Sequence, residues 1–319
     1  MKMLLLGADG QLGFALYQSL STLGPLAAAT RRGVLPGGIE CRRADLSDPD
    51  ALRALIRAER PDWLINAAAY TAVDRAESEP TLAGQINGQA LTAIGESARE
   101  VGARVLHFST DYVFSGQSLT PWRETDAPAP INAYGHSKWL GERLLAATGV
   151  DHLLLRIAWV YGPRGQNFLR SMLRLAGERE QLRVVADQIG TPTPAALVAG
   201  VSAILLQQLA AADAGDPRFG CYHLTAAGAT SWHAFAGEIL RLAATAGLIA
   251  RAPELQAIAS SEFPTPARRP AYSVLDTGKL RGTFGIELPD WRQGLVQTIS
   301  ALADARAQSL PVCSVGDRP

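Results

Sequence analysis

Short, almost uninterrupted runs of hydrophobic residues alternate with longer amphipathic segments through the first half of the chain. A run that is apolar at successive positions is typical of a strand covered on both faces of a parallel sheet, and apolar residues at helical spacing predict the covering helices. Strands are predicted at residues 3–6, 26–30, 63–66, 104–109 and 152–157, and helices at residues 10–23, 50–60, 82–101 and 133–147. The alternation indicates an α/β fold with a doubly wound, Rossmann-type parallel sheet.

The pattern changes after Trp159. Residues 1–160 are expected to form a dinucleotide-binding domain, joined again by elements near 182–210, and the remainder of 161–304 a smaller mixed α/β substrate-binding lobe. A Pro- and Ser-rich stretch at 115–130 is expected to be a loop beside the active site, and the polar residues 305–319 a mobile tail. Helices are predicted in the second part at 167–176, 195–209, 231–246 and 291–302, with short strands at 182–185 and 221–224.

The composition narrows the class of protein. Of 319 residues, 47% are hydrophobic and 19% are charged, which suits a globular protein with a large buried core. Thirty basic and 30 acidic side chains give a net charge of zero, so no positive excess indicates a nucleic acid or membrane partner. The longest apolar stretch, 195–206, is too short to span a membrane, and the run after Lys2 is too short for a signal peptide. We expect a soluble, cytoplasmic protein.

The cysteines and histidines indicate neither a disulfide framework nor a structural metal. Cys41, Cys221 and Cys313 are few, odd in number and widely separated, as expected in a reducing cytoplasm. The five histidines have no zinc-type spacing with cysteine or with one another. We therefore predict that the chain holds no metal.

A glycine-rich turn joins the first predicted strand to the first predicted helix. Gly7, Gly10 and Gly13 follow a G-x-x-G-x-x-G spacing. Glycines at these positions allow a tight turn, close approach of the backbone to a pyrophosphate, and close packing of the helix on the strand. Free N–H groups at the start of the helix favour phosphate binding. The location of the turn between strand and helix predicts a dinucleotide site.

Arg31 follows the second predicted strand, where dinucleotide-binding folds often carry an acidic residue that binds the adenosine ribose. The sequence here is Thr30-Arg31-Arg32. A guanidinium suits a 2′-phosphate because its planar fork pairs with phosphate oxygens. We predict NADPH as the cofactor, with NADH tolerated. The alternative is that both arginines are solvated loop charges.

Tyr134 and Lys138 lie four residues apart on a predicted helix, which places them one above the other on a single face. Phenol normally ionises at about pH 10, and a fixed ammonium neighbour favours the phenolate. Such a pair can move a proton to or from a carbonyl or hydroxyl oxygen. The same spacing is also common on solvated amphipathic helices, so the pair needs support from the rest of the chain.

Further segments give that support. They are A-A-Y-T-A-V-D at 68–74, S-T-D-Y-V-F at 109–114, R-x-x-W-V-Y-G at 156–162 and D-Q-x-G-x-P-T at 187–193. With the glycine loop and the Tyr134–Lys138 pair, they run in order over most of the chain. Together they resemble the extended short-chain dehydrogenase/reductase family and, within it, the dTDP-4-dehydrorhamnose reductases. The glycine loop and the Tyr–Lys pair specify only the superfamily, and the first two of these segments narrow the resemblance.

This resemblance implies reduction of the C4 carbonyl of dTDP-4-dehydro-β-L-rhamnose with NADPH, the final step of dTDP-L-rhamnose synthesis. Donors aimed at the carbonyl oxygen matter most, because charge develops there. Tyr134 would deliver the proton and Thr110 would hydrogen-bond the same oxygen. Lys138 would bind the nicotinamide ribose and hold the pKa of the phenol down. The alternative for Thr110 is an ordinary strand-end threonine, although the end of a parallel strand is where such sheets bind ligands.

Two further sets of contacts follow from the resemblance. Small side chains at 67–69 leave room for a dinucleotide, although simple strand packing also explains them, and the alternative for Trp159 is a place in the core. Beside Arg31, Tyr134 and Lys138, the expected cofactor contacts are Gly7, Gly10, Gln11, Leu12, Asp45, Leu46, Ala67, Ala68, Tyr70 and Asn87. The expected sugar-nucleotide contacts are Thr71, Val73, Asp111, Tyr112 and Trp159.

Related activities compete with reduction. Sugar-nucleotide dehydratases of the superfamily carry an Asp-Glu pair after the catalytic threonine, whereas Asp111 is followed here by Tyr112, so the second carboxylate is missing. Epimerases and a talose-forming reductase stay open, because the face of hydride delivery depends on how the substrate is oriented. A non-catalytic, dinucleotide-binding regulatory subunit also stays open, although it has no need of Thr110, Tyr134 and Lys138 together.

The resemblance also bears on assembly. Some members of the family form dimers through magnesium held by glutamates, and the equivalent positions here are Ala15 and Ala196. Alanine has no oxygen donor for a hard cation. We predict a monomer without a magnesium-bridged dimer, whose partner is a dTDP-sugar rather than a nucleic acid or a membrane.

Overall fold

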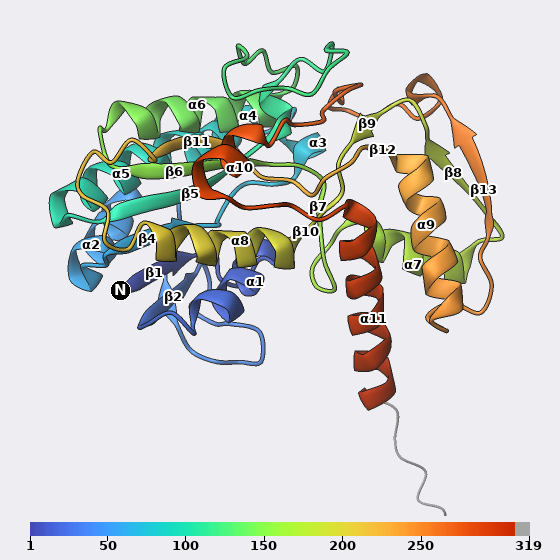
Figure 1. Cartoon of the computed structure of the whole chain (residues 1–319), viewed down its shortest axis with the longest axis horizontal. Coiled ribbons are helices and arrows are strands. Elements are labelled where there is room, and N and C mark those ends of the chain that lie inside the picture. The colour runs from blue at the N-terminus through green and yellow to red at the C-terminus, as the bar shows by residue number, and fades with distance from the viewer. Residues whose placement is uncertain (310–319) are drawn as a thin grey trace, which may run out of the picture.

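The apolar runs assemble into a seven-stranded sheet at the centre of a large α/β body (Figure 1). The computed structural model describes residues 1–309. The sheet has the order β11-β6-β5-β4-β1-β2-β3, and every neighbouring pair is parallel. The predicted Rossmann-type α/β fold is therefore confirmed. The strands are β1 (Met3–Leu6), β2 (Leu26–Thr30), β3 (Arg42–Arg43), β4 (Trp63–Asn66), β5 (Arg104–Thr110), β6 (His152–Ile157) and β11 (Gly220–His223).

Helices cover both faces of this sheet because the central strands are apolar on both sides (Figure 1). Leu5 of β1 packs in one core with Leu16 and Leu205, whereas Leu4 packs in a second core with Ile94. The first core is covered by α1 (Gln11–Leu20), α8 (Ala195–Gln208) and α10 (Gly278–Phe284), and the second by α2 (Pro49–Glu59), α5 (Ala90–Val101) and α6 (Ala133–Ala147).

The helix predicted at 82–101 differs from the structure. It is divided into α4 (Pro80–Gly84), a π-helical turn η1 (Gln85–Gln89) and α5. Asn87 lies inside the π turn, and its side-chain amide bonds both the N–H and the carbonyl of Tyr70. The wider turn is thus anchored by a tertiary contact that helical periodicity does not reveal. Two short elements complete the body: α3 (Val73–Ala76) and the 3₁₀ turn η2 (Asp111–Val113).

A smaller lobe lies beside the body (Figure 1, right). Its strand β8 (Gln181–Val185) pairs in parallel with β13 (Glu254–Ile258), which was not predicted, and not with the central sheet. The lobe has its own apolar core, in which Phe235 and Trp291 are fully buried. Its other elements are α7 (Phe168–Glu178), α9 (Trp232–Thr245), α11 (Trp291–Ser309), η3 (Ser260–Glu262), β7 (Val160–Tyr161), β9 (Ile189–Gly190), β10 (Thr193–Pro194) and β12 (Thr230–Ser231).

The chain crosses between body and lobe more than once. After the first lobe segments, α8 returns to pack on α1, and β11 joins the edge of the central sheet beside β6. Helix α11 continues to Ser309, so residues 305–309 are helical rather than part of the expected mobile tail. The rest of that expectation, residues 310–319, lies outside the described residues.

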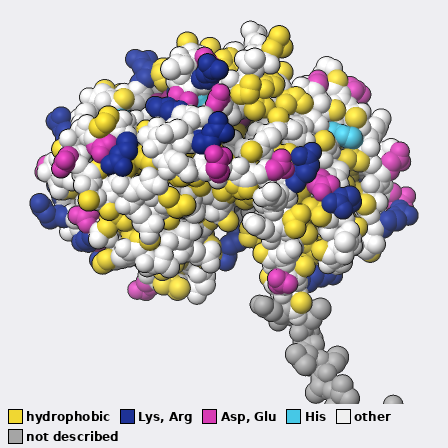
Figure 2. All heavy atoms as spheres, viewed as in Figure 1, with side chains coloured by type: hydrophobic (Ala, Val, Ile, Leu, Met, Phe, Trp, Pro, Cys, Tyr) yellow, Lys and Arg dark blue, Asp and Glu magenta, His cyan; other side chains and the backbone are white. Residues whose placement is uncertain are grey.

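The surface and the thiols agree with a globular chain. Positive and negative side chains are interspersed over the face shown in Figure 2. Within the described residues, every helix is too short or too polar to cross a bilayer. Cys41 and Cys221 are free thiols, and Cys313 lies beyond the part of the chain that the structure describes.

Candidate active site

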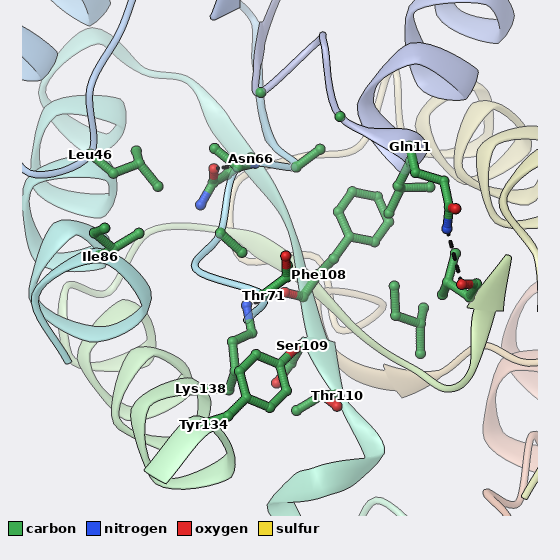
Figure 3. Close-up of a pocket in the computed structure, with 18 of the residues that line it drawn as sticks. Gln11, Leu46, Asn66, Thr71, Ile86, Phe108, Ser109, Thr110, Tyr134 and Lys138 are labelled. Carbon is green, nitrogen blue, oxygen red and sulfur yellow. Dashed lines mark hydrogen bonds between the residues drawn. The ribbon is translucent and has the colours of Figure 1, made fainter. Parts of the chain in front are cut away.

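One cavity of about 610 Å³ lies along the carboxyl ends of the central strands and extends to the small lobe (Figure 3). This is the edge at which parallel sheets bind ligands. The predicted residues on its wall are Gly7, Gly10, Gln11, Leu12, Arg31, Asp45, Leu46, Ala67, Ala68, Thr71, Val73, Thr110, Asp111, Tyr112, Tyr134, Lys138 and Trp159. The fold therefore brings together residues that are up to 152 positions apart in the sequence, from Gly7 to Trp159.

The glycine loop is packed so closely that side chains would not fit. Gly7 has a φ of +76°, and a Cβ there would lie 2.6 Å from the backbone nitrogen of Ala68. A Cβ on Gly13 would lie 1.9 Å from the carbonyl oxygen of Gly7. Helix α1 begins directly after Gly10, and no side chain caps its first N–H groups. These donors are open to a ligand, which fits the pyrophosphate of a dinucleotide.

Gln11 connects this loop to the small lobe. Its Nε2 donates to the carbonyl of Val160 at 3.0 Å, the contact drawn as a dashed line in Figure 3, and its Oε1 accepts from Nδ2 of Asn167 at 2.6 Å. At the far end of the cavity Arg31 lies near Asp45. The pKa of Asp45 is lowered chiefly by hydrogen bonds from Ser47, and the charge of Arg31 contributes.

The proposed catalytic groups converge on the centre of the cavity (Figure 3). Thr110 ends β5, and Tyr134 and Lys138 lie on α6, which Asn132 caps by accepting from the N–H of Gly135 at 2.7 Å. The capped helix starts immediately before Tyr134, so its first turn holds the phenol beside the end of β5. Thr110 is only 6% exposed and Lys138 only 2%, whereas the residue Tyr134 is half-buried. Thr110 and Lys138 are therefore shielded from bulk water, and Tyr134 lies between them and the open cavity.

The electrostatics of Tyr134 differ from the sequence-based prediction. Burial raises the pKa of Tyr134 to about 12, and the charge of Asp111 acts in the same direction, whereas the hydrogen bond with Thr110 opposes it. The expected lowering by Lys138 is not seen, because Nζ of Lys138 is directed at the carbonyl oxygen of Phe108, 2.6 Å away. A raised pKa keeps the phenol protonated at neutral pH, which is the form that can donate a proton.

Two other titratable groups on the wall are shifted by burial. The pKa of Asp111 is raised to about 7, although hydrogen bonds such as that from Oγ1 of Thr110 at 3.0 Å act against the shift. The pKa of Lys138 is lowered to about 8, while the charge of Glu142 opposes this. The ring of Tyr112 meets Tyr134 edge-on, with centroids 5.9 Å apart. Shifted groups gathered in one cleft are typical of an active site.

An aromatic wall closes the side of the cavity nearest the small lobe. Trp159 has a φ of 45°, a strained conformation for a bulky residue, and its ring stacks on Trp232 at 3.5 Å with an interplanar angle of 5°. A Cβ at Gly190 would lie 2.4 Å from the same indole. Trp159 is thus held in the cavity wall by a partner ring and a close backbone, rather than simply buried in the core.

Two predicted cofactor residues do not lie on the wall. Asn87 is buried behind it and bonds the backbone of Tyr70 and the hydroxyl of Ser137. The phenol of Tyr70 donates instead to Glu79 at 2.7 Å. Both residues belong to the layer that supports the cavity.

Sequence reasoning also missed several residues of the wall. Asn66, Phe108 and Ser109 are at or near the carboxyl ends of predicted strands. Because parallel sheets bind ligands at these ends, their positions in the sequence could have predicted that they line the cavity. Trp232 opens a helix 73 positions after its partner Trp159, and nothing in the sequence pattern connects the two. The full set is Asp9, Ala44, Asn66, Ile86, Phe108, Ser109, Ile157, Val160 and Trp232. Ala69, one of the small residues expected at 67–69, is also on the wall.

The fold and the cavity define a dinucleotide-binding enzyme of the extended short-chain dehydrogenase/reductase type. Residues 1–304 match the family described as the RmlD substrate binding domain. A dTDP-4-dehydrorhamnose reductase of Burkholderia thailandensis is 45% identical over 297 residues, 92% of this chain and 96% of the relative. The chain belongs to the dTDP-4-dehydrorhamnose reductase family.

Solved structures agree with this assignment. The dTDP-4-dehydrorhamnose reductase of Clostridium acetobutylicum superposes with a TM-score of 0.84 at 33% identity, covering 95% of this chain and 99% of the other. That of Bacillus anthracis, solved in complex with NADP, superposes with a TM-score of 0.82 at 32% identity, covering 94% of this chain and all of the other.

Proposed function

We propose that this chain reduces the C4 ketone of dTDP-4-dehydro-β-L-rhamnose to dTDP-L-rhamnose with NADPH. The observation that carries the proposal is the convergence of Thr110, Tyr134 and Lys138 on a cavity that begins at an uncapped, glycine-rich helix start. The family membership supports the same substrate class. NADPH, once bound, supplies the hydride. The residues of this chain bind the cofactor and the substrate and supply the proton.

Different residues of the cavity bind the cofactor and transfer the proton. The open N–H groups after Gly10 bind the pyrophosphate, and Arg31 binds the 2′-phosphate. Lys138, on the cavity wall, would donate a hydrogen bond to the nicotinamide ribose. The hydroxyls of Thr110 and Tyr134 then face the substrate carbonyl, where Thr110 donates a hydrogen bond and Tyr134 transfers its proton as negative charge develops on the oxygen. The raised pKa of Tyr134 supports this assignment, because the phenol must begin the reaction protonated.

The small lobe and the cavity wall next to it bind the sugar nucleotide in this proposal. We propose that residues 1–160, with returning elements of the range 182–210, bind the dinucleotide and that the remainder of 161–304 binds the sugar nucleotide. Two strands depart from this division: β8 pairs with β13 in the small lobe, and β11 joins the central sheet. Trp159 and Trp232 offer stacked apolar rings, and Thr71, Val73, Asp111 and Tyr112 complete the substrate side of the cavity. Gln11 supports a coupling of the two parts, since its amide bonds both Val160 and Asn167.

The test is turnover with product identification. The purified chain is incubated with dTDP-4-dehydro-β-L-rhamnose and NADPH, oxidation of the cofactor is followed at its absorbance band, and the product is identified by NMR. Stoichiometric formation of dTDP-L-rhamnose supports the proposal. Formation of the talo product would show that the chain is a talose-forming reductase instead. Tight NADPH binding without turnover would favour a regulatory subunit.

We also propose that the chain acts as a monomer without magnesium, in the cytoplasm. Ala15 and Ala196 support this, since neither side chain has an oxygen ligand. Light scattering with and without EDTA is the measurement, and a dimer that the chelator dissociates would contradict the proposal. Fractionation of the source cells tests the location.

A further inference from the structure

His107 lies directly beneath the proposed active site and has no part in the proton transfer described above. It occupies the middle of β5, is 1% exposed, and places its Nε2 3.3 Å from Nζ of Lys138. On its other side Nδ1 lies 3.1 Å from Nδ2 of Asn66, the residue opposite it on β4. A buried chain of three polar side chains thus runs from β4 to α6, under the cavity floor.

The hydrogen bonds of Asn66 select one tautomer of this imidazole. Its Oδ1 accepts from the backbone N–H of Ala68 at 3.2 Å, which leaves Nδ2 as the donor towards His107. Nδ1 of His107 must therefore accept, and the proton of a neutral imidazole must lie on Nε2. Burial, with the charge of Lys138 adding to it, lowers the pKa of His107 well below its ordinary value, so the ring is neutral.

The surroundings of Lys138 are consequently asymmetric. The carbonyl of Phe108 accepts one of its hydrogens at 2.6 Å, whereas the Nε2–H of His107 points at the nitrogen itself. A neutral amine offers a lone pair to that N–H, and an ammonium does not. On the same helix, Tyr134 is neutral, and the charge of Glu142 is shared with Arg156 of β6 at 2.7 Å and Ser109 of β5 at 2.5 Å.

We propose that His107 is a positioning residue for Lys138, which fixes the direction of the ε-amino group and favours its neutral form before cofactor binds. Beside its bond to carbon, Nζ has three bonding directions. The carbonyl of Phe108 and the ring of His107 occupy two of them, so the third is available on the side of the cavity. The inference rests on the proposed function only where turnover is the readout.

The tautomer can be tested without turnover. In the cofactor-free wild-type chain, ¹⁵N NMR of the histidine side chains should show one buried imidazole with a protonated Nε2 and an unprotonated Nδ1 that does not titrate between pH 5 and 9. Assignment comes from comparison with the His107→Gln chain. A protonated Nδ1, or titration of this ring in that range, overturns the proposal even if the chain proves inactive.

Two substitutions separate the contacts of His107. In His107→Gln, the amide reaches Lys138 and its oxygen can accept from an ammonium, so the alkaline limb of the pH profile of kcat/KM should move up by about half a unit or more. In His107→Asn, the shorter amide keeps Asn66 but leaves Nζ with the carbonyl of Phe108 as its one remaining partner of the two, and kcat/KM should fall about tenfold as the amine loses its fixed direction.

The matched control is His136→Gln, since the side chain of His136 is exposed on the same helix, α6, as Lys138. Its pH profile should be that of the wild type. An alkaline limb that stays in place in His107→Gln, with kcat/KM within twofold in both His107 variants, overturns the proposal. Should both variants fail to fold, the wild-type spectrum decides alone, with the His107 ring assigned through correlations to its own backbone resonances in the isotope-labelled chain.

Discussion

The two walls of the cavity are built on different principles. The body presents Thr110, Tyr134 and Lys138 from a seven-residue strand and a 15-residue helix, both regular. The lobe side presents Trp159 from a strained backbone between two strands, and its strands β7, β9, β10 and β12 have two residues each. Proton transfer needs atoms fixed within a fraction of an ångström, which regular elements provide. Apolar stacking tolerates small displacements, so irregular backbone serves where the shape of a substrate has to be matched.

The largest effect should come from the body. In Tyr134→Phe, kcat should fall by roughly two to four orders of magnitude, the usual range for loss of a general acid, while NADPH still binds. Stopped-flow and fluorescence titration measure the two quantities. Tyr17→Phe, a substitution on α1 away from the cavity, is the control and should be unchanged. Near-normal turnover in Tyr134→Phe would show that the phenol is not the proton donor. The body wall would then no longer differ from the lobe wall in carrying the proton transfer.

The rigidity of the body can be tested at the buried ion pair beneath Lys138. Glu142 and Arg156 are 5% and 4% exposed and lie 2.7 Å apart. Glu142→Leu leaves the guanidinium buried and unpaired, so unfolding in urea should show a loss of about 3–5 kcal/mol. Adding Arg156→Met should restore more than half of it. Arg57→Ala removes an exposed pair with Glu100, which solvent screens, and should change the stability far less than Glu142→Leu does. An equal loss in the buried and exposed cases would contradict the comparison.

Arg31 tests whether the adenosine end of the body selects the cofactor. In Arg31→Ala, affinity for NADPH should fall by about tenfold or more, because a charge-assisted hydrogen bond to the 2′-phosphate is lost, whereas affinity for NADH should change less than twofold. Arg32→Ala is the matched control, since Arg32 is not on the cavity wall. Equal losses of affinity for NADPH and NADH in the Arg31 variant would contradict the proposal that Arg31 binds the 2′-phosphate.

The lobe should respond in KM rather than in kcat. Trp232→Ala removes the ring stacked on Trp159, and KM for the dTDP-sugar should rise by about tenfold, with kcat within about threefold. Trp232→Phe keeps an aromatic face and should recover most of the affinity. A fall in kcat as large as that of Tyr134→Phe would show that the aromatic wall takes part in the chemistry, not only in holding the substrate.

The smallest predicted effect concerns stability and pH. The folded-state pKa of Asp111 is raised to about 7 from an ordinary value of 3.8, so its contribution is present at low pH and is lost as pH rises through 7. Asp111→Asn stays neutral, and its stability relative to wild type should increase by at least about 1 kcal/mol between pH 5 and pH 8. Urea unfolding at the two pH values measures this. Asp50→Asn, at an exposed carboxylate, is the control, and the same difference at both pH values would argue against a buried, protonated Asp111.

Local patterns predicted the regular parts of the molecule well. The helix at 133–147 and the strand at 152–157 have the predicted bounds, because their periodicity and their flanking turn residues agree with the tertiary structure. The strand β13 was missed, since only Ile258 of its five residues is buried and the run lacks an apolar signature. The π turn at Gln85–Gln89 was missed because a contact between Asn87 and Tyr70 stabilises it.

The sequence alone determined the fold class, the glycine loop, and the residue types that carry the proposed chemistry, because strand periodicity and motif spacing are local properties. Only the tertiary structure decided the environment of those groups. Burial reversed the expected shift of the pKa of Tyr134, the carbonyl of Phe108 and the ring of His107 determined the direction of Lys138, and folding placed Trp232 against Trp159. Desolvation and contact depend on neighbours that are distant in the chain, which no local pattern encodes.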